Sequence, residues 1–512
     1  MDSREFLGDS IAVSLAKGLA VASAVVLNLS IALQFGVGHQ ADAFFLAYAA
    51  PGALAGAMAT AVRVALVPSI VRLFKEQPED WRILPTLGLI GFLFWVTVAV
   101  VAILGRESYV NIVPPSITSA AERLTLQITK WVFVLIPLTW LVEFLRALLI
   151  AQQRFVLPLV GECVANLLAI CLILIVSRNR GIVIVGVSFI AKMLVQATVS
   201  VLGLERNTRA LWPPVALGHG KRIYSALSGL AVRLGGSLLR QGSTIMERFW
   251  SASLKVGTLS ALSYAQMGSN MLSTVFSTSV ATVLLPTLSY SAHKLHENHA
   301  GTSADAIRLV IFLTAPVAGL GIVFSYPICQ AIFALNDTPA ASVTLTSRLL
   351  AIYALRTSSL ALIAVLLTPF YAHGDVWTPV KHMILMLAIN LALDLLLFPY
   401  FAVYAFPVAA IITDGLSIGR GFWLQRKINI QHSARKLGRD SAVILVSLGT
   451  ALVLATAIRD WGTRIAHEGI GQLVLVTVTA GFGVTVYLMA TYVAGVPEAA
   501  MLASTIRKKL RL

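Results

Sequence analysis

Long apolar runs recur along the chain, and most charged residues lie in the short segments between them. Runs long enough to cross the hydrocarbon core of a bilayer occur about fourteen times. They lie near residues 10–34, 43–71, 83–104, 126–151, 156–177, 181–203, 224–249, 258–290, 307–334, 344–371, 378–397, 403–424, 440–459 and 470–495. These runs are too long for barrel strands, and only helices satisfy the backbone of such spans internally. The pattern predicts an all-α integral membrane protein with about 14 transmembrane helices.

Residues 41–70 and 259–288, in the second and eighth predicted helices, align with each other without a gap. They share seven identities in thirty positions, at a constant offset of 218 residues. Shared small-residue composition is one explanation, but the similar endings VPSI at 67–70 and LPTL at 285–288 favour a duplication. Internal repeats are typical of transporters.

The repeat predicts how the helices are grouped. Its two copies lie six spans apart, an even number, so the two halves point the same way and form a parallel repeat about the membrane normal. We expect an N-terminal six-helix bundle at 1–222 and a C-terminal six-helix bundle at 223–427. Residues 428–512 then form two additional transmembrane helices and a basic cytoplasmic tail.

Composition agrees with a membrane protein. Of the 512 residues, 57% are apolar and 12% are charged, and the mean hydropathy is +0.83. A soluble domain cannot bury that much apolar surface. The formal net charge of +16 does not indicate nucleic-acid binding, because the Lys and Arg residues are scattered through short loops. Their excess in alternate loops predicts that both termini face the cytoplasm.

Charged residues inside the predicted spans mark candidate substrate contacts. Arg233, Arg240 and Glu247 are spaced by seven residues, almost two helical turns, so they share one face of the seventh span. Such a face must line a cavity or pair internally. We expect Arg233 and Arg240 to bind an anion, with Arg63 and Asp42 as further substrate contacts. Arginine suits diphosphate because its planar fork donates two parallel hydrogen bonds. The alternative is a salt bridge within the bundle.

A second polar set lies in the eleventh and twelfth spans. Asn390 and Asp394 are one turn apart on one helix face, and Thr413 and Asp414 follow in the next span. Carboxylate, amide and hydroxyl oxygens are the ligands that hard cations prefer. A Na⁺ or H⁺ site is one interpretation, and hydrogen bonding between helices is the other.

Motifs of ATP-driven or catalytic proteins are missing from the sequence. It contains no P-loop, no HExxH motif and no recognisable nucleophile–base pair. The three cysteines, Cys163, Cys171 and Cys329, lie in apolar runs without metal-binding spacing. We therefore expect a transporter without enzymatic activity and without a bound cofactor.

Several segments resemble the MviN/MurJ family of lipid flippases. They are ADAFFLAY at 41–48, GTLSALSYA at 257–265, ATVLLPTLS at 281–289 and LLTPFYAHGDVWTPV at 366–380. The resemblance implies fourteen helices in two bundles around a central cavity. It also implies alternating access that moves lipid-linked saccharides across the bacterial inner membrane.

The resemblance also implies roles for individual residues. Asp42 matches a functional acidic residue of the family motif. The family's proposed sodium site matches in chemical type, as the set Glu247, Asn390, Asp394 and Thr413.

The substrate-binding arginines of the family do not match. Typical lipid II flippases carry arginine in the first span where this chain has Val21 and Leu27. Their paired arginines in the second span become Ala55-Gly56, and another becomes Met267. The implied substrate is therefore either lipid II or a polyprenyl-diphosphate-linked exopolysaccharide or O-antigen unit.

Two other functions stay open. One is a membrane scaffold that has kept the fold and lost transport, which the set of possible cation ligands argues against. The other is a cation-coupled multidrug antiporter, which the arginines in the spans argue against. The expected partners are the lipid-linked saccharide and the bilayer, with no nucleic acid; the sequence names no partner protein.

Overall fold

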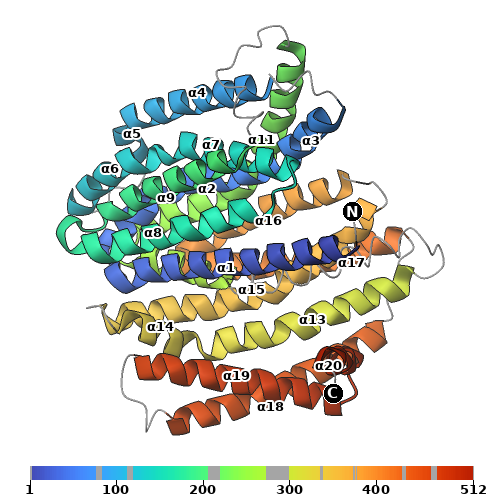
Figure 1. Cartoon of the computed structure of the whole chain (residues 1–512). Coiled ribbons are helices and arrows are strands. Elements are labelled where there is room, and N and C mark those ends of the chain that lie inside the picture. The colour runs from blue at the N-terminus through green and yellow to red at the C-terminus, as the bar shows by residue number, and fades with distance from the viewer. Residues whose placement is uncertain are drawn as a thin grey trace. The chain divides into compact units, whose positions relative to one another are not determined.

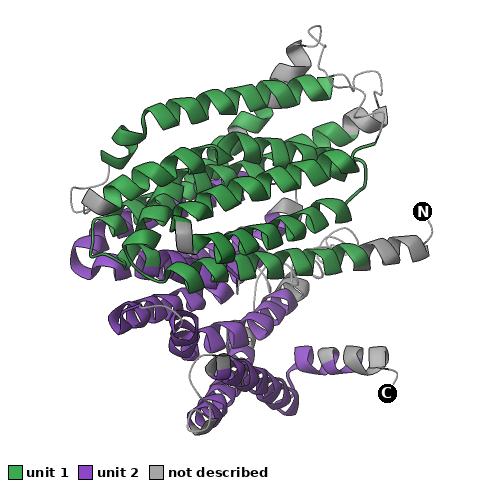
Figure 2. Ribbon diagram, turned by 60° about the vertical axis from the view of Figure 1, so that its left-hand side comes forward, with its two compact units in different colours: residues 1–260 green, residues 261–512 purple. Residues whose placement is uncertain are grey.

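The structure is a computed structural model that describes residues 3–76, 83–111, 119–205, 220–271, 299–334, 338–372, 375, 377–428, 434–462 and 470–510. All regular secondary structure in these residues is helical (Figure 1). Contacts within the chain group it into two compact units, residues 1–260 and 261–512 (Figure 2).

The first unit is built on long helices packed along one another. They are α1 (Ser3–Phe35), α2 (His39–Ala61), the π-helix η1 (Val62–Leu66), α3 (Val67–Glu76), α4 (Ile83–Leu104), α5 (Arg106–Asn111), α6 (Ser119–Phe133), α7 (Leu135–Ala151), α8 (Val156–Arg180), α9 (Val183–Gly203) and α11 (Gly220–Ala252). Helix α8 packs on α1 and α9, α7 packs on α4 and α9, and α11 packs along α2.

The second unit has the same kind of packing. Its helices are α13 (His299–Val323), α14 (Ser325–Phe333), α15 (Ala340–Ala372), α16 (Trp377–Phe401), the 3₁₀ turn η4 (Ala402–Tyr404), α17 (Ala405–Lys427), α18 (Ala434–Gly462), α19 (Ile470–Val493) and α20 (Pro497–Leu510). Helix α15 packs on α13 and α17, α16 packs on α17, and α18 packs on α13 and α19.

These helices fall on the predicted spans. Eleven stretches of described residues are long and apolar enough to cross a membrane, and one of them, Trp377–Lys427, contains both α16 and α17. The predicted span at 224–249 falls on α11, and the one at 258–290 is described only as far as residue 271. The all-α membrane fold is thus confirmed. The second copy of the repeat lies largely outside the described residues.

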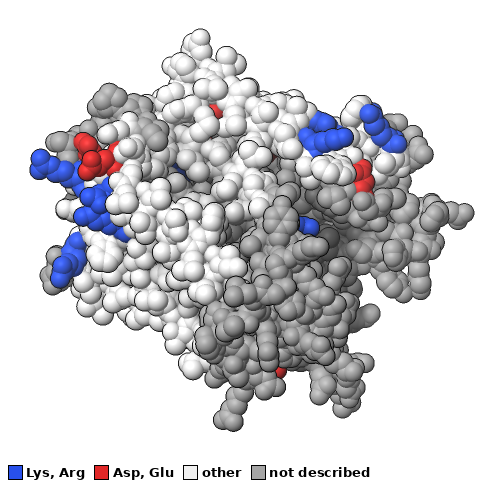
Figure 3. All heavy atoms as spheres, turned by 90° about the horizontal axis from the view of Figure 1, so that it is seen from above, with Lys and Arg blue, Asp and Glu red and all other residues white. Residues whose placement is uncertain are grey.

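The distribution of charge on the surface agrees with a membrane protein. On the face seen in Figure 3, most of the charged side chains that are coloured gather toward two opposite edges. A largely uncharged band lies between them, as helices surrounded by lipid require.

The boundary between the two compact units, at residues 260 and 261, differs from the predicted boundary between the two bundles, at residues 222 and 223. Helix α11 groups with the first unit because it packs along α2. The units describe packing in one conformation, so the predicted bundles at 1–222 and 223–427, and the segment 428–512, stay predictions.

Two glycines allow α4 to approach α7 closely. Trp140 of α7 donates a hydrogen bond from Nε1 to the carbonyl oxygen of Gly88, over 3.0 Å. A Cβ added at Gly91 would lie 2.1 Å from a Trp140 ring atom, and one added at Gly88 would lie 2.7 Å from the Phe144 ring. Any larger residue would push these helices apart, so glycine is required at both positions.

A charge network holds the C-terminal helices to α13. Arg308 of α13 bridges Asp440 of α18 at 3.0 Å and Glu498 of α20 at 3.1 Å. Deeper in the unit, Tyr487 of α19 donates its hydroxyl to the carbonyl oxygen of Phe312 over 2.8 Å. The last predicted spans are therefore tied to the second unit by polar contacts as well as by apolar packing.

Asp375 caps the first turn of α16. Its Oδ1 accepts the backbone N–H of Thr378 over 3.0 Å. The first N–H groups of a helix lack partners within the helix, which is why Asp is favoured here. Hydrogen bonds from the Thr378 side chain and backbone lower the pKa of the Asp375 carboxyl below its ordinary value. This contact accounts for the Asp and Thr of the GD-x-x-TPV motif.

Asp375→Ala should lower the thermal midpoint of the solubilised protein, whereas Asp375→Asn, which keeps an acceptor oxygen, should retain most of it. Because folding lowers the carboxyl pKa, its stabilisation is present above the unfolded-state pKa. It is lost as pH falls through the folded-state pKa, which lies below the ordinary pKa of an aspartate carboxyl. The Asn variant should lack this pH dependence. Equal midpoints for the Ala and Asn variants would contradict the capping role.

Candidate functional site

Asp42, in the first turn of α2, binds the backbone at the start of another helix. Its Oδ2 accepts the N–H of Gly257 at 2.5 Å, and its Oδ1 accepts the N–H of Ser260 at 2.7 Å. Helical residues begin at Thr258, so Asp42 caps this helix from a distant part of the chain. The partial positive charge of a helix N-terminus stabilises the carboxylate. Gly257 has a φ of 89°, which favours glycine.

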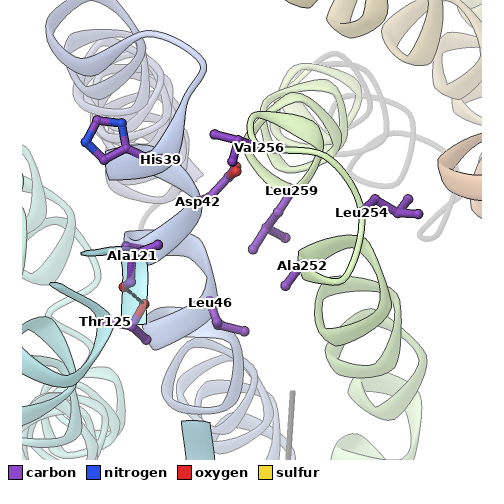
Figure 4. Close-up of a pocket in the computed structure, with 10 residues that line it drawn as sticks. His39, Asp42, Leu46, Ala121, Thr125, Ala252, Leu254, Val256 and Leu259 are labelled. Atoms are coloured by element: carbon purple, nitrogen blue, oxygen red, sulfur yellow. Dashed lines mark hydrogen bonds between the residues drawn. The ribbon is translucent and has the colours of Figure 1, made fainter. Parts of the chain in front are cut away.

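A small pocket lies beside this contact (Figure 4). It is lined by His39, Asp42, Ala43, Leu46, Ala121, Thr125, Ala252, Leu254, Val256 and Leu259. In Figure 4, Asp42 points toward the segment that carries Val256. The Thr125 hydroxyl donates to the carbonyl oxygen of Ala121 over 2.8 Å, within its own helix. The lining is mostly apolar, and the carboxylate of Asp42 is occupied by backbone donors in this conformation.

The predicted arginines lie on η1 and on α11, which pack on each other. Arg63 lies in η1, is exposed, and donates from Nε to the carbonyl oxygen of Ala59 over 2.8 Å. Arg233 is exposed on α11. Arg240 is on the same helix, but its side chain lies outside the described part of the chain. Neither Arg63 nor Arg233 forms an ion pair with a carboxylate of the described residues.

Arg248 was not among the predicted site residues. It lies on α11, directly after Glu247, and is partly buried. Its Nε is buried and has no hydrogen-bond partner among the described residues. The titratable groups that act on it electrostatically are Tyr48, Glu247 and Tyr109. Sequence reasoning followed the face of Arg233, Arg240 and Glu247, and Arg248 lies on a different one.

The predicted cation ligands are divided between the two units. Asn390 of α16 donates from Nδ2 to the Thr413 hydroxyl of α17 over a long 3.5 Å. Asp394 follows Asn390 by one turn and is 1% exposed. Asn390 and Thr413 meet where α16 packs on α17, and Asp394 lies one turn along α16. Glu247 is also buried, but it lies on α11 in the other unit.

Other carboxylates in the spans are paired with arginines. Arg146 of α7 lies 3.4 Å from Glu143, three residues earlier on the same helix, and 3.0 Å from Glu162 of α8. Asp414 of α17 pairs with Arg356 of α15 at 2.9 Å. With Asp414 paired to Arg356, the predicted cation ligands in this unit are Asn390, Asp394 and Thr413.

Comparisons with known proteins place this arrangement in a family. The model of the family described as "Lipid II flippase MurJ" matches residues 31–505. A probable lipid II flippase MurJ from Aquifex aeolicus is 24% identical over 395 residues, which are 76% of this chain and 77% of that protein. A lipid II flippase MurJ from Burkholderia cenocepacia is 25% identical over 366 residues, 69% of this chain and 70% of that protein.

Solved structures share the fold. A lipid II flippase MurJ in an inward closed conformation superposes with a TM-score of 0.76 at 18% identity, covering 99% of this chain and 100% of that one. An inward-facing multidrug resistance transporter of the MATE family gives a TM-score of 0.61 at 14% identity, covering 84% and 95% of the two chains.

Proposed function

We propose that this chain, which belongs to the lipid II flippase MurJ family, moves a polyprenyl-diphosphate-linked saccharide across the bacterial inner membrane by alternating access. The observation that carries the proposal is the family match over residues 31–505. The curated relatives are themselves named as lipid II flippases. The reaction is translocation, with no bond made or broken in the substrate.

The substrate class is defined by a lipid diphosphate. Lipid II and a lipid-linked exopolysaccharide or O-antigen unit share this group and differ in the saccharide. Val21, Leu27 and Met267 are neutral residues at positions where typical lipid II flippases carry arginine. The proposal therefore includes both kinds of saccharide as candidate substrates. The part of Arg63, Arg233 and Arg240 in binding the diphosphate remains a prediction, which their glutamine variants test in the transport assay below.

The Asp42 contact supplies one closure for alternating access. Such a cycle needs contacts that form in one state and break in another. Asp42 joins α2 to the segment after α11 through two hydrogen bonds and no covalent bond. A hydrogen bond to a charged group contributes about 1.5 to 3 kcal/mol, which is strong enough to hold a state and weak enough to release it. We propose that Asp42 closes the transport path where α2 meets the segment after α11, in addition to contacting the substrate.

Coupling is assigned to the oxygen set at α16 and α17. Asp394 supplies a carboxylate, Asn390 an amide and Thr413 a hydroxyl, with Glu247 as the predicted fourth group. A Na⁺ or H⁺ bound more tightly in one state shifts the equilibrium between states by no more than that difference in affinity. Helix-to-helix hydrogen bonding alone is the competing role for these residues.

The function is tested by reconstituting the purified chain in liposomes that contain fluorescent lipid II or a polyprenyl-diphosphate-linked exopolysaccharide unit. We expect the chain to move at least one of them between leaflets, and the saccharide preference identifies the substrate. Asp42→Asn should slow this movement strongly, whereas Asp460→Asn, which changes a carboxylate that is 65% exposed, should not.

The same liposomes test coupling. Transport is followed against Na⁺ at fixed pH and then against pH without Na⁺. Asp394→Asn should abolish whichever dependence the wild type shows. Indifference of the wild type to both ions removes the coupling role. Movement of neither lipid, in protein that remains folded, overturns the flippase proposal and leaves the scaffold or the antiporter.

The location and orientation are part of the proposal. We place the chain in the bacterial inner membrane with both termini in the cytoplasm, because the loops richest in Lys and Arg alternate with poor ones. A reporter fused near His432 should then read as cytoplasmic, and one near Gly462 as external. The two fusion points lie on either side of α18. Matching signals at both points would contradict the topology.

A further inference from the structure

The contact between α2 and α11 has an unusual composition. On α2, Tyr48, Gly52 and Gly56 follow one another at intervals of four residues and form one stripe. On α11, Gln241 and Arg248 are seven residues apart and share a face. A Cβ added at Gly56 would lie 3.0 Å from Nε2 of Gln241. Gly56 therefore leaves room for the Gln241 side chain of α11 to lie against α2, and Gly52 leaves room for the Tyr48 ring.

Arg248 is the charged member of this face. Its Nε is sealed from solvent without a hydrogen-bond partner, and no ion pair joins its guanidinium to a described carboxylate. Glu247 acts on it electrostatically, but adjacent helix positions point about 100° apart and do not face each other. An arginine inside a membrane bundle normally has a partner, because desolvating the charge is costly. Here the protein supplies aromatic neighbours instead.

Two more donors lie on the same two stripes. The Tyr48 hydroxyl and the Gln241 amide form no hydrogen bond with any described residue. Tyr109, the other phenol that acts on Arg248, is already used, because its hydroxyl donates to the carbonyl oxygen of Leu46 over 2.8 Å. The guanidinium of Arg248 can only donate hydrogen bonds, and the Tyr48 hydroxyl and the Gln241 NH₂ group can each donate as well. Three side chains able to donate therefore lie on the two facing helices, as an oxygen-rich anion requires.

The ring contacts around Tyr48 fix the direction of its side chain. Its ring stacks on Phe44 with centroids 5.7 Å apart, and Phe189 of α9 packs edge-on at 5.7 Å. On the other side, Tyr109 packs edge-on against Phe249, the residue after Arg248, at 5.4 Å. Both phenols are therefore held in place before a ligand arrives, which reduces the ordering cost of binding.

The position of Arg248 relates it to the closure at Asp42. Arg248 lies one turn, about 6 Å along the axis, before Ala252, and Ala252 lines the pocket beside Asp42. On the facing helix, Leu46 lies one turn after Asp42, and its carbonyl oxygen holds the Tyr109 hydroxyl. An anion bound at Arg248 would therefore lie close to the contact between Asp42 and the segment after α11, where we propose that the transport path closes.

We propose that Arg248, Tyr48 and Gln241 form a binding site for the diphosphate group of the transported lipid. This inference rests on the proposed function for the identity of the lipid, and on the geometry alone for the anion. The site lies on the second and seventh spans, and Arg248 of the seventh supplies positive charge to a chain that lacks the expected arginines of the first, second and eighth spans. Arg248 is planar and doubly donating, as a diphosphate requires, and Tyr48 and Gln241 add neutral donors.

The test measures binding rather than transport, on the solubilised full chain, with inorganic diphosphate and polyprenyl diphosphate as separate probes. Arg248→Gln should weaken binding at least about tenfold, the range expected for losing a hydrogen bond to a charged group. Arg248→Lys keeps the positive charge but lacks the planar guanidinium, so its affinity should lie between those of the wild type and Arg248→Gln. Tyr48→Phe should weaken binding about threefold to tenfold, as for a neutral hydrogen bond.

Matched surface variants control for general effects. Arg439→Gln removes an arginine that is 84% exposed, and Tyr400→Phe removes a hydroxyl from a residue that is 81% exposed. Both should bind as the wild type does. Thermal midpoints are measured for every variant, and Tyr48→Phe and Arg248→Lys remain informative if Arg248→Gln does not fold.

The outcomes separate this site from the function it rests on. The Arg248→Gln variant could lose binding while the wild type binds the probes but flips no lipid-linked saccharide. That result would support the site and overturn the transport proposal. Binding of both probes would support a site for the phosphates alone, and binding of polyprenyl diphosphate only would support a lipid headgroup site. The proposal would be overturned if Tyr48→Phe and a folded Arg248 variant, either Arg248→Gln or Arg248→Lys, both bound the probes with wild-type affinity. Arg248 would then be a packing residue among aromatic rings.

Discussion

A charge inside a bilayer must find a partner or a polar space, and this constraint explains most of the polar structure of the chain. Asp42 finds two backbone N–H groups at a helix N-terminus. Arg146 finds Glu162, and Arg356 finds Asp414. The first and third contacts join segments that are distant in the sequence, and the second joins the successive helices α7 and α8. The cost of burying these charges is thus offset by specific contacts between helices. A helix whose polar groups are not matched in this way must face a ligand, an ion or water.

The constraint also separates structural from functional charges. Asp414 looked like a cation ligand beside Thr413 in the sequence, but its pair with Arg356 satisfies it. Arg248 was not among the predicted site residues, yet its guanidinium forms no ion pair with a carboxylate of the described residues. The same physical rule therefore removes one candidate and adds another. The diphosphate of a lipid carrier is the kind of group that completes the second case.

Sequence reasoning predicted the helical membrane fold because apolar length is a local property that one chain segment displays by itself. It did not predict that Asp42 would cap the helix beginning at Thr258, because that contact joins residues more than two hundred positions apart. The seven-residue spacing of Gln241 and Arg248 can be seen in the sequence, but only the structure shows that Gln241 lies against Gly56 of α2.

The central claim is that the Asp42 carboxylate holds the N–H groups of Gly257 and Ser260, and that this contact opens and closes. Amide hydrogen exchange of the peptide covering residues 253–262 measures it directly, with α4 as an internal reference. The account predicts slow exchange in the wild type and exchange at least about tenfold faster in Asp42→Asn, because a charge-assisted hydrogen bond is lost. It also predicts faster exchange when lipid-linked substrate is being transported. Equal rates in the wild type and in Asp42→Asn would contradict it.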